Sequence, residues 1–561
     1  MLFAILEELV QLLCVKFSEK VQIPHTPTPN TLTPNTLIFT TFVEATAHQM
    51  SKKLPLGIQD FRKIIENGFL YIDKTPWIYR MVSSPGAYFL SRPRRFGKSI
   101  TVSMLYELYN GSRELFKGLW IEDKWDWSRK NPVIRLTLTG SGFVELGLEP
   151  ALHYMMDKMI GEQNLALVNA GISGKFEYLI QQMSRKGKVV VLVDEYDAPI
   201  VHYLGIDTDK AKGNREILRE LYTTLKNNDQ YLELVFLTGV SKFSKTGIFS
   251  GLNNLTDLTM HPQYATMLGY TQAELEYYFE EEITETAQQM NLTREALLEK
   301  LREWYNGYRF HVRSETVYNP VSVNNFFNQR EFENFWFATG TPTFLVNILK
   351  KEGIYALHLE HISQLEFDSF ELEDIRPYGL LYQTGYLTIQ SRDEYGLYTL
   401  DYPNLEVKDS MLAYLMETYG GVSKGTGVST AVRMEKAFMT GDIDGVMQAL
   451  QSIFAHIPYQ LYEKRPEKFY HAAIHLLFTY MGLRVRSEVC TSDGRVDSLV
   501  ETPDRIYLLE FKLDKTAREA LDQILSRKYY RSAWERGKPV TCVGVNFSSE
   551  TKNIESWVSE P

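Results

Sequence analysis

The stretch Ala87-Tyr-Phe-Leu-Ser-Arg-Pro-Arg-Arg-Phe-Gly-Lys-Ser99 joins a short apolar run to a glycine-lysine-serine turn. Its apolar part predicts a buried strand, and the apolar spacing of 100–108 predicts an amphipathic helix directly after the turn. The first turn of a helix carries unpaired backbone N–H groups and a partial positive charge, which both favour a bound phosphate. The stretch therefore predicts a phosphate-binding loop.

The side chains of the turn suit ATP together with Mg²⁺. Lys98 can reach the terminal phosphates, and the Ser99 hydroxyl can ligate the metal. The usual pattern Gly-x-x-x-x-Gly-Lys-[Ser/Thr] is not fully met, because Arg92 stands at the place of the first glycine. A coincidental Gly-Lys-Ser at a helix start therefore stays an alternative. The residues expected to bind ATP around the loop are Arg94, Arg95, Phe96, Gly97, Lys98, Ser99 and Ile100.

A second apolar run ends in two acids. Lys188-Val-Val-Val-Leu-Val-Asp-Glu-Tyr-Asp197 predicts a buried strand followed by Asp194 and Glu195. In an open α/β sheet, ligands bind at the carboxyl ends of parallel strands, so these acids are expected to face the loop. Asp194 would hold Mg²⁺ through water, and Glu195 would polarise the attacking water as a catalytic residue. The alternative is a buried strand with a solvated acidic turn.

Three segments, Arg92-Pro-Arg-Arg-Phe-Gly-Lys-Ser99, Val193-Asp-Glu-Tyr-Asp-Ala-Pro199 and Thr238-Gly-Val-Ser-Lys-Phe-Ser244, resemble the AAA-ATPase-like proteins. Many of these carry a C-terminal PD-(D/E)XK nuclease-like domain, and the resemblance covers about residues 51–550. It implies an α/β fold: a P-loop NTPase parallel sheet with a helical lid region, followed by an α/β PD-(D/E)XK nuclease-like domain. An arginine at the first-glycine place is part of the family's pattern.

The resemblance also assigns a role to Thr238. This residue ends the apolar run 232–237 and would occupy the sensor position of AAA-type ATPases, which hydrogen-bonds the γ-phosphate or its water. The alternative is that Thr238 and Ser241 only cap a turn. AAA-like ATPases often form rings with an arginine donated in trans, which leaves a homo-oligomer open. The arginines considered for that role are Arg94, Arg95, Arg309 and Arg376.

Composition and resemblance together predict four parts. Residues 26–37 form a tandem Thr-Pro-Asn repeat that cannot build a core, so the N-terminal extension is expected to be disordered, with Met50 as the natural initiator. A flexible linker is predicted for the glycine-rich run Gly420–Gly427. The parts are a low-complexity extension (1–50), an AAA-like P-loop ATPase core (51–265), a helical lid and linking region (266–420) and a nuclease-like domain (421–561).

The overall composition is that of a globular protein of the cytoplasm. Hydrophobic residues make up 44% of the chain, which is ample for buried cores. The net charge of -10 argues against a uniformly basic surface, so a nucleic acid would have to meet a local basic patch. The cysteines Cys14, Cys490 and Cys542 are too widely separated for a metal pair or a disulfide framework. The apolar start 1–17 is too short to span a bilayer, and no membrane partner is expected. A poorly ordered terminus is expected there, and an amphipathic helix that binds a partner or a membrane surface is the alternative.

A second chemical centre is predicted near the C-terminus. Asp497 lies on one predicted strand, and Ile506-Tyr-Leu-Leu-Glu-Phe-Lys512 forms the returning strand after a turn. Alternate residues of a strand share a face, so Glu510 and Lys512 point together and Asp497 can meet them. The two acids would bind Mg²⁺, and Lys512 would orient or help deprotonate the water that attacks a phosphodiester. A solvated charged strand face is the alternative.

The resemblance adds further residues to this centre. Glu467, at the head of an apolar helix, matches the helix acid of PD-(D/E)XK folds, and Gln523 also fits the pattern. Basic residues between 505 and 538 could neutralise phosphates, so DNA is expected as a partner, with ordinary solvated charges as the alternative. The predicted function is an ATP-binding and ATP-hydrolysing protein whose nucleotide state gates a Mg²⁺-dependent DNA nuclease. The rival is a nucleotide-dependent DNA-binding or signalling scaffold whose nuclease-like domain no longer cuts.

Overall fold

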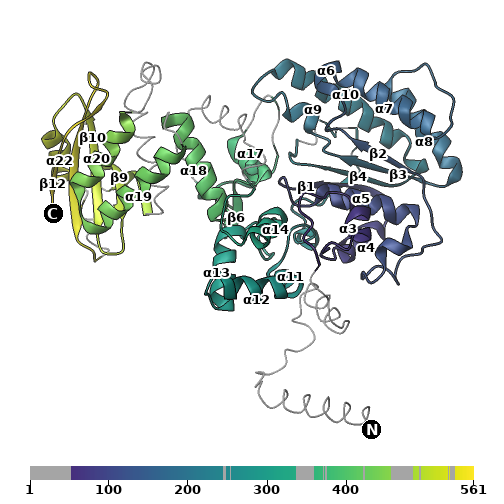
Figure 1. The fold of residues 1–561 in the computed structure, drawn as a ribbon. Coiled ribbons are helices and arrows are strands. Elements are labelled where there is room, and N and C mark those ends of the chain that lie inside the picture. The colour runs from purple at the N-terminus through teal and green to yellow at the C-terminus, as the bar shows by residue number, and fades with distance from the viewer. Residues whose placement is uncertain are drawn as a thin grey trace, which may run out of the picture. The chain divides into compact units, whose positions relative to one another are not determined.

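The computed structural model describes most of the chain after residue 51 (Figure 1). The described residues are 52–243, 248–249, 251–252, 254–336, 359–369, 372, 376–420, 424–455, 484–491, 494–528, 530 and 537–561. Everything below concerns the unit Lys53–Pro561. The predicted N-terminal extension and Glu467 lie outside the described residues.

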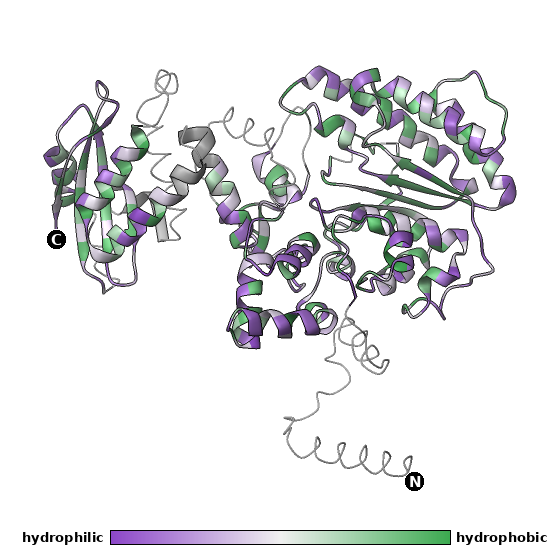
Figure 2. Cartoon of the chain, viewed as in Figure 1, coloured by the Kyte–Doolittle hydropathy of each residue, from purple (hydrophilic) through white to green (hydrophobic). Residues whose placement is uncertain are grey.

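A parallel sheet forms the core of the N-terminal part, which confirms the predicted fold class. Its strand order is β2-β3-β4-β1-β5, and the register pairs Thr137 with Asp194 and Ser91 with Gly239. The central strands β3 and β4 are buried along their whole length, as their largely apolar sequences predict (Figure 2). The strands are β1 (Gly86–Ser91), β2 (Val133–Thr137), β3 (Val189–Asp194), β4 (Leu232–Gly239) and β5 (Leu255–Asp257).

Helices cover both faces of this sheet (Figure 1). Helix α5 follows β1 directly and lies against β2, β3 and β4, with α3 packed on its outer side. Helices α7, α8 and α10 pack on one another over the other face. The helices of this part are α3 (Phe61–Glu66), α4 (Thr75–Val82), α5 (Lys98–Asn110), α6 (Phe143–Leu146), α7 (Leu148–Glu162), α8 (Ile172–Met183), α9 (Ala198–Val201) and α10 (Thr208–Asn227).

The middle of the chain is mainly helical, as predicted, with a small hairpin. Part of it has a hydrophobic core of its own, built on Phe279, Leu301 and Phe326. The hairpin strands β6 and β7 pair antiparallel. The elements are α11 (Gln272–Tyr278), α12 (Glu280–Gln289), α13 (Arg294–Tyr305), α14 (Pro320–Gln329), α16 (Gln364–Phe367), α17 (Pro377–Thr384), β6 (Thr388–Arg392), β7 (Tyr398–Asp401) and α18 (Leu405–Gly420).

The C-terminal part is a mixed sheet with strand order β12-β11-β10-β9-β8. Only β10 and β11 pair in parallel; the other described pairs in this sheet are antiparallel. Helix α22 packs on β10 and β11, whereas α20 contacts β12 and lies against α19. The elements are α19 (Lys424–Thr440), α20 (Ile443–Phe454), β8 (Arg484–Thr491), β9 (Gly494–Glu501), β10 (Ile506–Leu513), α22 (Ala517–Ser526), β11 (Val540–Ser548) and β12 (Asn553–Glu560).

One local prediction is wrong for five of its eight residues, and the other three, 421–423, lie outside the described residues. The glycine-rich run Gly420–Gly427 was expected to be a flexible linker, but Gly420 ends α18 and 424–427 begin α19. Packing explains the difference, because α19 lies against both α18 and α20, and tertiary contacts stabilise a helix despite the poor helix propensity of glycine. The four part boundaries themselves stay predictions.

Candidate functional site

The phosphate-binding loop lies between β1 and α5, as the sequence predicts. Gly97 caps the helix with φ 91°, a left-handed conformation that L side chains rarely adopt. Arg95 has φ 70° and is therefore also left-handed. A Cβ at Gly97 would meet no atom within 4 Å, so this position favours glycine for its backbone angles and not for lack of space. The first N–H groups of α5 begin at Lys98, where a phosphate is expected.

Lys98 folds back onto the loop. Its Nζ donates to the carbonyl oxygens of Arg92 and Pro93, both at 2.9 Å, and the side chain is buried. Burial lowers the pKa of Lys98 to about 8, although the nearby carboxylates of Asp194 and Glu195 act in the opposite direction. A bound phosphate would replace the two carbonyl groups as the partner of this ammonium.

Arg92, at the place of the usual first glycine, is a buried anchor. Its guanidinium donates to the carbonyl oxygens of Ser91 (2.9 Å), Thr259 (2.7 Å) and Tyr264 (3.0 Å). It also lies 4.0 Å from the ring centroid of Phe310. The departure from the usual pattern therefore has a structural reason: the arginine fastens the start of the loop to distant segments.

Aromatic residues of the middle part pack on the same loop. The Phe96 ring lies edge-on to Tyr308 and Phe310, with centroids 4.9 and 5.5 Å apart. The indole N–H of Trp336 donates to the carbonyl oxygen of Arg94 at 3.1 Å. The sequence offered no role for the aromatic segment 304–310, because its partners are some two hundred residues away along the chain. The structure shows that the end of this segment supports the loop.

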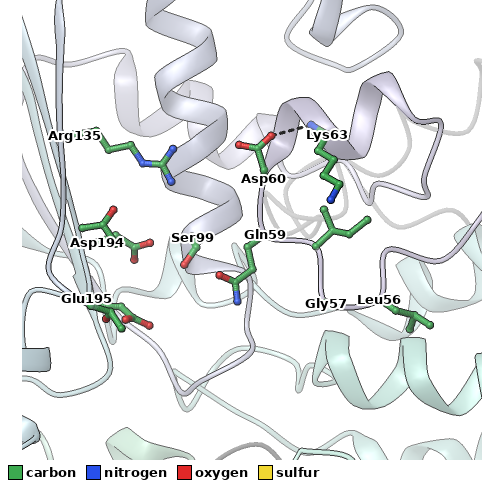
Figure 3. Close-up of a pocket in the computed structure, with 12 residues that line it drawn as sticks. Leu56, Gly57, Gln59, Asp60, Lys63, Ser99, Arg135, Asp194 and Glu195 are labelled. Atoms are coloured by element: carbon green, nitrogen blue, oxygen red, sulfur yellow. Dashed lines mark hydrogen bonds between the residues drawn. The ribbon is translucent and has the colours of Figure 1, made fainter. Parts of the chain in front are cut away.

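The acidic end of β3 faces the start of α5 across a cavity of about 680 Å³. Ser99, Asp194 and Glu195 all line it, as the predicted magnesium and water positions require (Figure 3). Within the described part of the chain, Asp194 is buried and its Oδ1 accepts no hydrogen bond. An unpartnered buried carboxylate oxygen beside a serine hydroxyl fits a hydrated Mg²⁺. Burial and the charge of Asp194 raise the pKa of Glu195, which suits a group that takes up a proton.

Thr238 lies on β4, between the strand that leads into the loop and the strand that carries the acids. Its hydroxyl donates to the carbonyl oxygen of Leu90 at 2.8 Å, and the residue is fully buried. The backbone N–H of Ser241 donates to Asp197 at 2.6 Å, which ties the ends of β4 and β3 together. The Ser241 hydroxyl is buried and, among the described residues, has no hydrogen-bond partner. The sensor role of Thr238 stays a prediction.

In the C-terminal centre, Asp497, Glu510 and Lys512 lie together, whereas the predicted Glu467 lies outside the described residues. Register places Asp497 of β9 beside Glu510 of β10, and the N–H of Asp497 donates to Glu510 Oε2 at 3.3 Å. Asp497 Oδ2 accepts the N–H of Phe511 at 2.8 Å. Lys512, on the same strand face, donates from Nζ to Glu510 Oε1 at 3.0 Å. Gln523 of α22 donates to the same oxygen.

The carboxylates of Asp497 and Glu510 repel each other electrostatically. Glu510 is buried, and burial together with the negative charge of Asp497 raises the pKa of Glu510 to about 7, although Lys512 opposes the shift. A divalent cation between the two groups would favour their charged forms. No cluster of three or more His, Cys, Asp or Glu side chains suited to a metal occurs among the described residues. Mg²⁺ often keeps several waters and takes one or two carboxylates, so the pair is a fitting donor set.

Comparison with known proteins agrees with both centres. Residues 55–249 match a family model described as a predicted AAA-ATPase, and residues 465–557 match the PD-(D/E)XK nuclease superfamily. The chain is also 38% identical, over 531 residues, to an uncharacterized protein encoded in the vnfD 5' region of Azotobacter chroococcum mcd 1. That alignment covers 91% of this chain and 99% of the relative. The chain belongs to the AAA-ATPase-like family with a C-terminal PD-(D/E)XK nuclease domain.

Several residues at the candidate nucleotide site of this AAA-ATPase-like protein were not predicted. Gln59 and Asp60 line the cavity opposite the acids, and Arg135 and Thr137 line it from β2 (Figure 3). The alternating pattern of Val133-Ile-Arg-Leu-Thr137 places Arg135 and Thr137 on one face, and this signal was available in the sequence. None of the helices in the described residues is long and apolar enough to cross a bilayer.

Proposed function

We propose that this protein binds and hydrolyses ATP with Mg²⁺, and that its nucleotide state gates the cleavage of DNA by the C-terminal domain. The observation that carries the proposal is the cavity that Ser99, Asp194 and Glu195 share next to the buried Lys98. A lysine, a hydroxyl and two acids around the start of a helix are the groups needed to bind a nucleoside triphosphate and activate water.

Each residue of the nucleotide site has a proposed role. Lys98 exchanges the carbonyl groups of Arg92 and Pro93 for phosphate oxygens. Ser99 and Asp194 hold the metal, and Glu195 polarises the attacking water. The backbone N–H groups from Arg94 to Ile100 surround the phosphates. Thr238 senses the γ-phosphate by exchanging its hydrogen bond to Leu90.

The C-terminal domain has an analogous set of roles. Bound Mg²⁺ would offset the negative charge of a phosphodiester and lower the pKa of its water. Asp497 and Glu510 would hold this ion, with Glu467 as a further acid. Lys512 orients the attacking water, and the basic residues of 505–538 neutralise DNA phosphates.

The contacts between the loop and the middle part support the gating proposal. Trp336 donates from its indole to Arg94 of the loop and from its backbone N–H to Glu406 Oε1 at 2.6 Å. Glu406 lies in the first turn of α18, and α18 contacts α19. From α19, the carbonyl oxygen of Phe438 accepts the hydroxyl of Tyr507, which lies on β10 with Glu510.

The test is cleavage of linear and circular DNA, single- and double-stranded, with Mg²⁺ or Mn²⁺ and with or without ATP. Lys98→Ala should abolish ATP turnover, and Glu510→Ala should abolish cutting but leave turnover intact. Cutting that survives Glu510→Ala would remove Glu510 from the mechanism. Cutting that ATP does not change would refute the gating.

The scaffold alternative has one observation in its favour. Both carboxylate oxygens of Glu510 accept hydrogen bonds, Oε1 from Lys512 and Gln523 and Oε2 from the N–H of Asp497. A carboxylate held by these three donors could have a purely structural role, as one member of a buried hydrogen-bond network. ATP hydrolysis without cutting of any DNA form, combined with nucleotide-dependent DNA binding, would favour the scaffold. Under both hypotheses we assign the protein to the cytoplasm, since its three cysteines are widely spaced and Cys542 is a buried free thiol.

A further inference from the structure

Arg135 lies on β2, next to the strand that ends in the magnesium-site acid. The register pairs Arg135 with Leu192 and Thr137 with Asp194, so Arg135 is two residues before the position beside the acid. Residues two apart on a strand share a face, and both Arg135 and Thr137 line the cavity that contains Ser99 and Asp194. Figure 3 shows Arg135, Asp194 and Glu195 on the same wall, with Gln59 and Asp60 across from them.

The guanidinium of Arg135 has no protein partner in the described part of the chain. Two other arginines near the sheet are paired: Arg129 forms an ion pair with Glu233, and Arg62 forms one with Glu107. Arg135 and Asp194 line the same cavity, yet they do not form an ion pair with each other, and Asp194 Oδ1 is unpartnered as well. A cation and an anion that face one cavity without meeting leave room for a ligand that contacts both.

We infer that Arg135 binds the terminal phosphate of Mg²⁺-bound ATP within the same chain and so supplies the arginine that stabilises the transferring phosphoryl group. The inference rests on the proposed ATPase function. A terminal phosphate carries the negative oxygens that a planar guanidinium binds well, and a metal held by Ser99 and Asp194 would offset further negative charge of the triphosphate. Charge that develops on the phosphoryl oxygens is then met from two sides of the cavity.

The arginines that the sequence singled out lie elsewhere. Arg309 donates to the carbonyl oxygen of Gln390 at 2.7 Å, and Arg376 donates to that of Leu365 at 2.7 Å. Arg94 and Arg95 belong to the loop, and neither lines the cavity. Arg135 is therefore the arginine that lies with the metal-site residues.

The first experiment measures binding without turnover. Dissociation constants for ADP and for a non-hydrolysable ATP analogue, both with Mg²⁺, are determined by titration calorimetry for the wild type, Arg135→Ala, Arg135→Lys and Lys63→Ala. Arg135→Ala should raise the dissociation constant of the analogue about tenfold or more, since a charged hydrogen bond is lost, and should leave that of ADP unchanged. Arg135→Lys should recover part of the loss. Lys63 lines the same cavity but is exposed, so Lys63→Ala controls for the loss of one positive charge: it should keep the ratio of the two constants within about twofold of the wild type.

Two results would overturn the inference. Arg135→Ala could weaken the binding of ADP and of the analogue equally, or leave the affinity for the analogue unchanged. Either result would show that Arg135 does not contact the terminal phosphate. If Arg135→Ala does not fold, the comparison of Arg135→Lys with the wild type carries the test. A wild type that binds neither nucleotide would instead refute the proposed ATPase function.

A second experiment tests whether the arginine acts within its own chain. Arg135→Ala keeps an intact loop, and Lys98→Ala keeps Arg135 but loses its phosphate-binding lysine. Each variant alone should lose about a thousandfold or more of the turnover. If the arginine acts in cis, mixing the two restores nothing at any protein concentration. Restored turnover in the mixture would show that a second copy donates the arginine, and would overturn the cis assignment.

Discussion

At the residue scale, both centres contain buried ionisable side chains. Lys98 is held by two carbonyl groups, whereas Asp194 Oδ1 has no hydrogen-bond partner among the described residues. Glu510 is buried beside Asp497, and its pKa is raised to about 7. Burying such groups costs free energy unless a ligand compensates them, which is why they mark functional sites.

Glu510→Gln should change how stability depends on pH. Because the pKa of Glu510 rises from 4.5 to about 7 on folding, the native state binds this proton more tightly than the unfolded chain does. The contribution of Glu510 is therefore fully present below pH 4.5 and is lost as the pH rises through 7. The thermal midpoint of the wild type, relative to that of the variant, should fall across this window, and Mg²⁺ should reverse the fall at pH 8.

The quantity to compare is the thermal midpoint of the wild type minus that of Glu510→Gln. Burial also raises the pKa of Glu406 to about 7, and this group titrates in both proteins, so its effect cancels in the difference. Calorimetric scans at several pH values, with and without Mg²⁺, supply it. Parallel curves for wild type and variant would show that Glu510 is already charged in the native state.

At the element scale, close packing of a helix on a strand positions Gln523, a hydrogen-bond partner of Glu510 in the C-terminal centre. A Cβ on Gly544 of β11 would lie 2.2 Å from the carbonyl oxygen of Ala517 and 2.4 Å from the N–H nitrogen of Leu521. Helix α22 can approach the sheet this closely only because position 544 has no side chain. Gln523 of the same helix then reaches Glu510.

Gly544→Ala should push α22 away from the sheet. Overpacking of this kind costs about 1–3 kcal/mol, and Gln523 should lose its contact with Glu510. Hydrogen exchange measured by mass spectrometry should be faster in α22 and β11, and metal binding at Asp497 and Glu510 should change with it. Gly161→Ala is the matched control, since a Cβ there meets nothing within 4 Å inside α7 and should stabilise the protein by about 0.5–1 kcal/mol. Unchanged exchange in α22 would contradict the packing argument.

The sequence predicts elements better than it predicts their partners. The strands around the loop and the acids follow from uninterrupted apolar runs, and the pairing of Asp497 with Glu510 follows from a short turn between adjacent strands. The anchoring of Arg92 could not be predicted, because Thr259 and Tyr264 are far along the chain. The flexible linker predicted for Gly420–Gly427 was wrong for its helical residues for the same reason, since packing between α18, α19 and α20 stabilises the helices there. Arg135 was within reach, because strand alternation places it on the same face as Thr137, and both residues line the cavity.

At the scale of the whole molecule, the question is how a nucleotide in one part affects a carboxylate pair in another. The contacts run from the loop through Trp336 and Glu406 to α18, and from α19 through Tyr507 to β10. Contiguity alone does not establish coupling, which requires a measured effect of each ligand on the other. Trp336 is the first link, and its indole N–H is the part of it that touches the loop.

Trp336→Phe should weaken the coupling while both sites persist. The phenyl ring can still pack on Tyr386, whose ring lies 5.1 Å from the indole, but the donor to the Arg94 carbonyl is lost. We expect the effect of ATP on DNA cleavage to shrink about fivefold or more, with ATP turnover and ATP-free cleavage within about threefold of the wild type. Linkage demands that the effect of ATP on DNA affinity and the effect of DNA on ATP affinity shrink by the same factor, and fluorescence titrations of each ligand with and without the other measure this. Trp304→Phe is the control, because Trp304 packs on Phe332 in the separate helical core. If both variants reduce the coupling equally, the route through Trp336 is wrong, and the nucleotide must act on the nuclease domain through another contact.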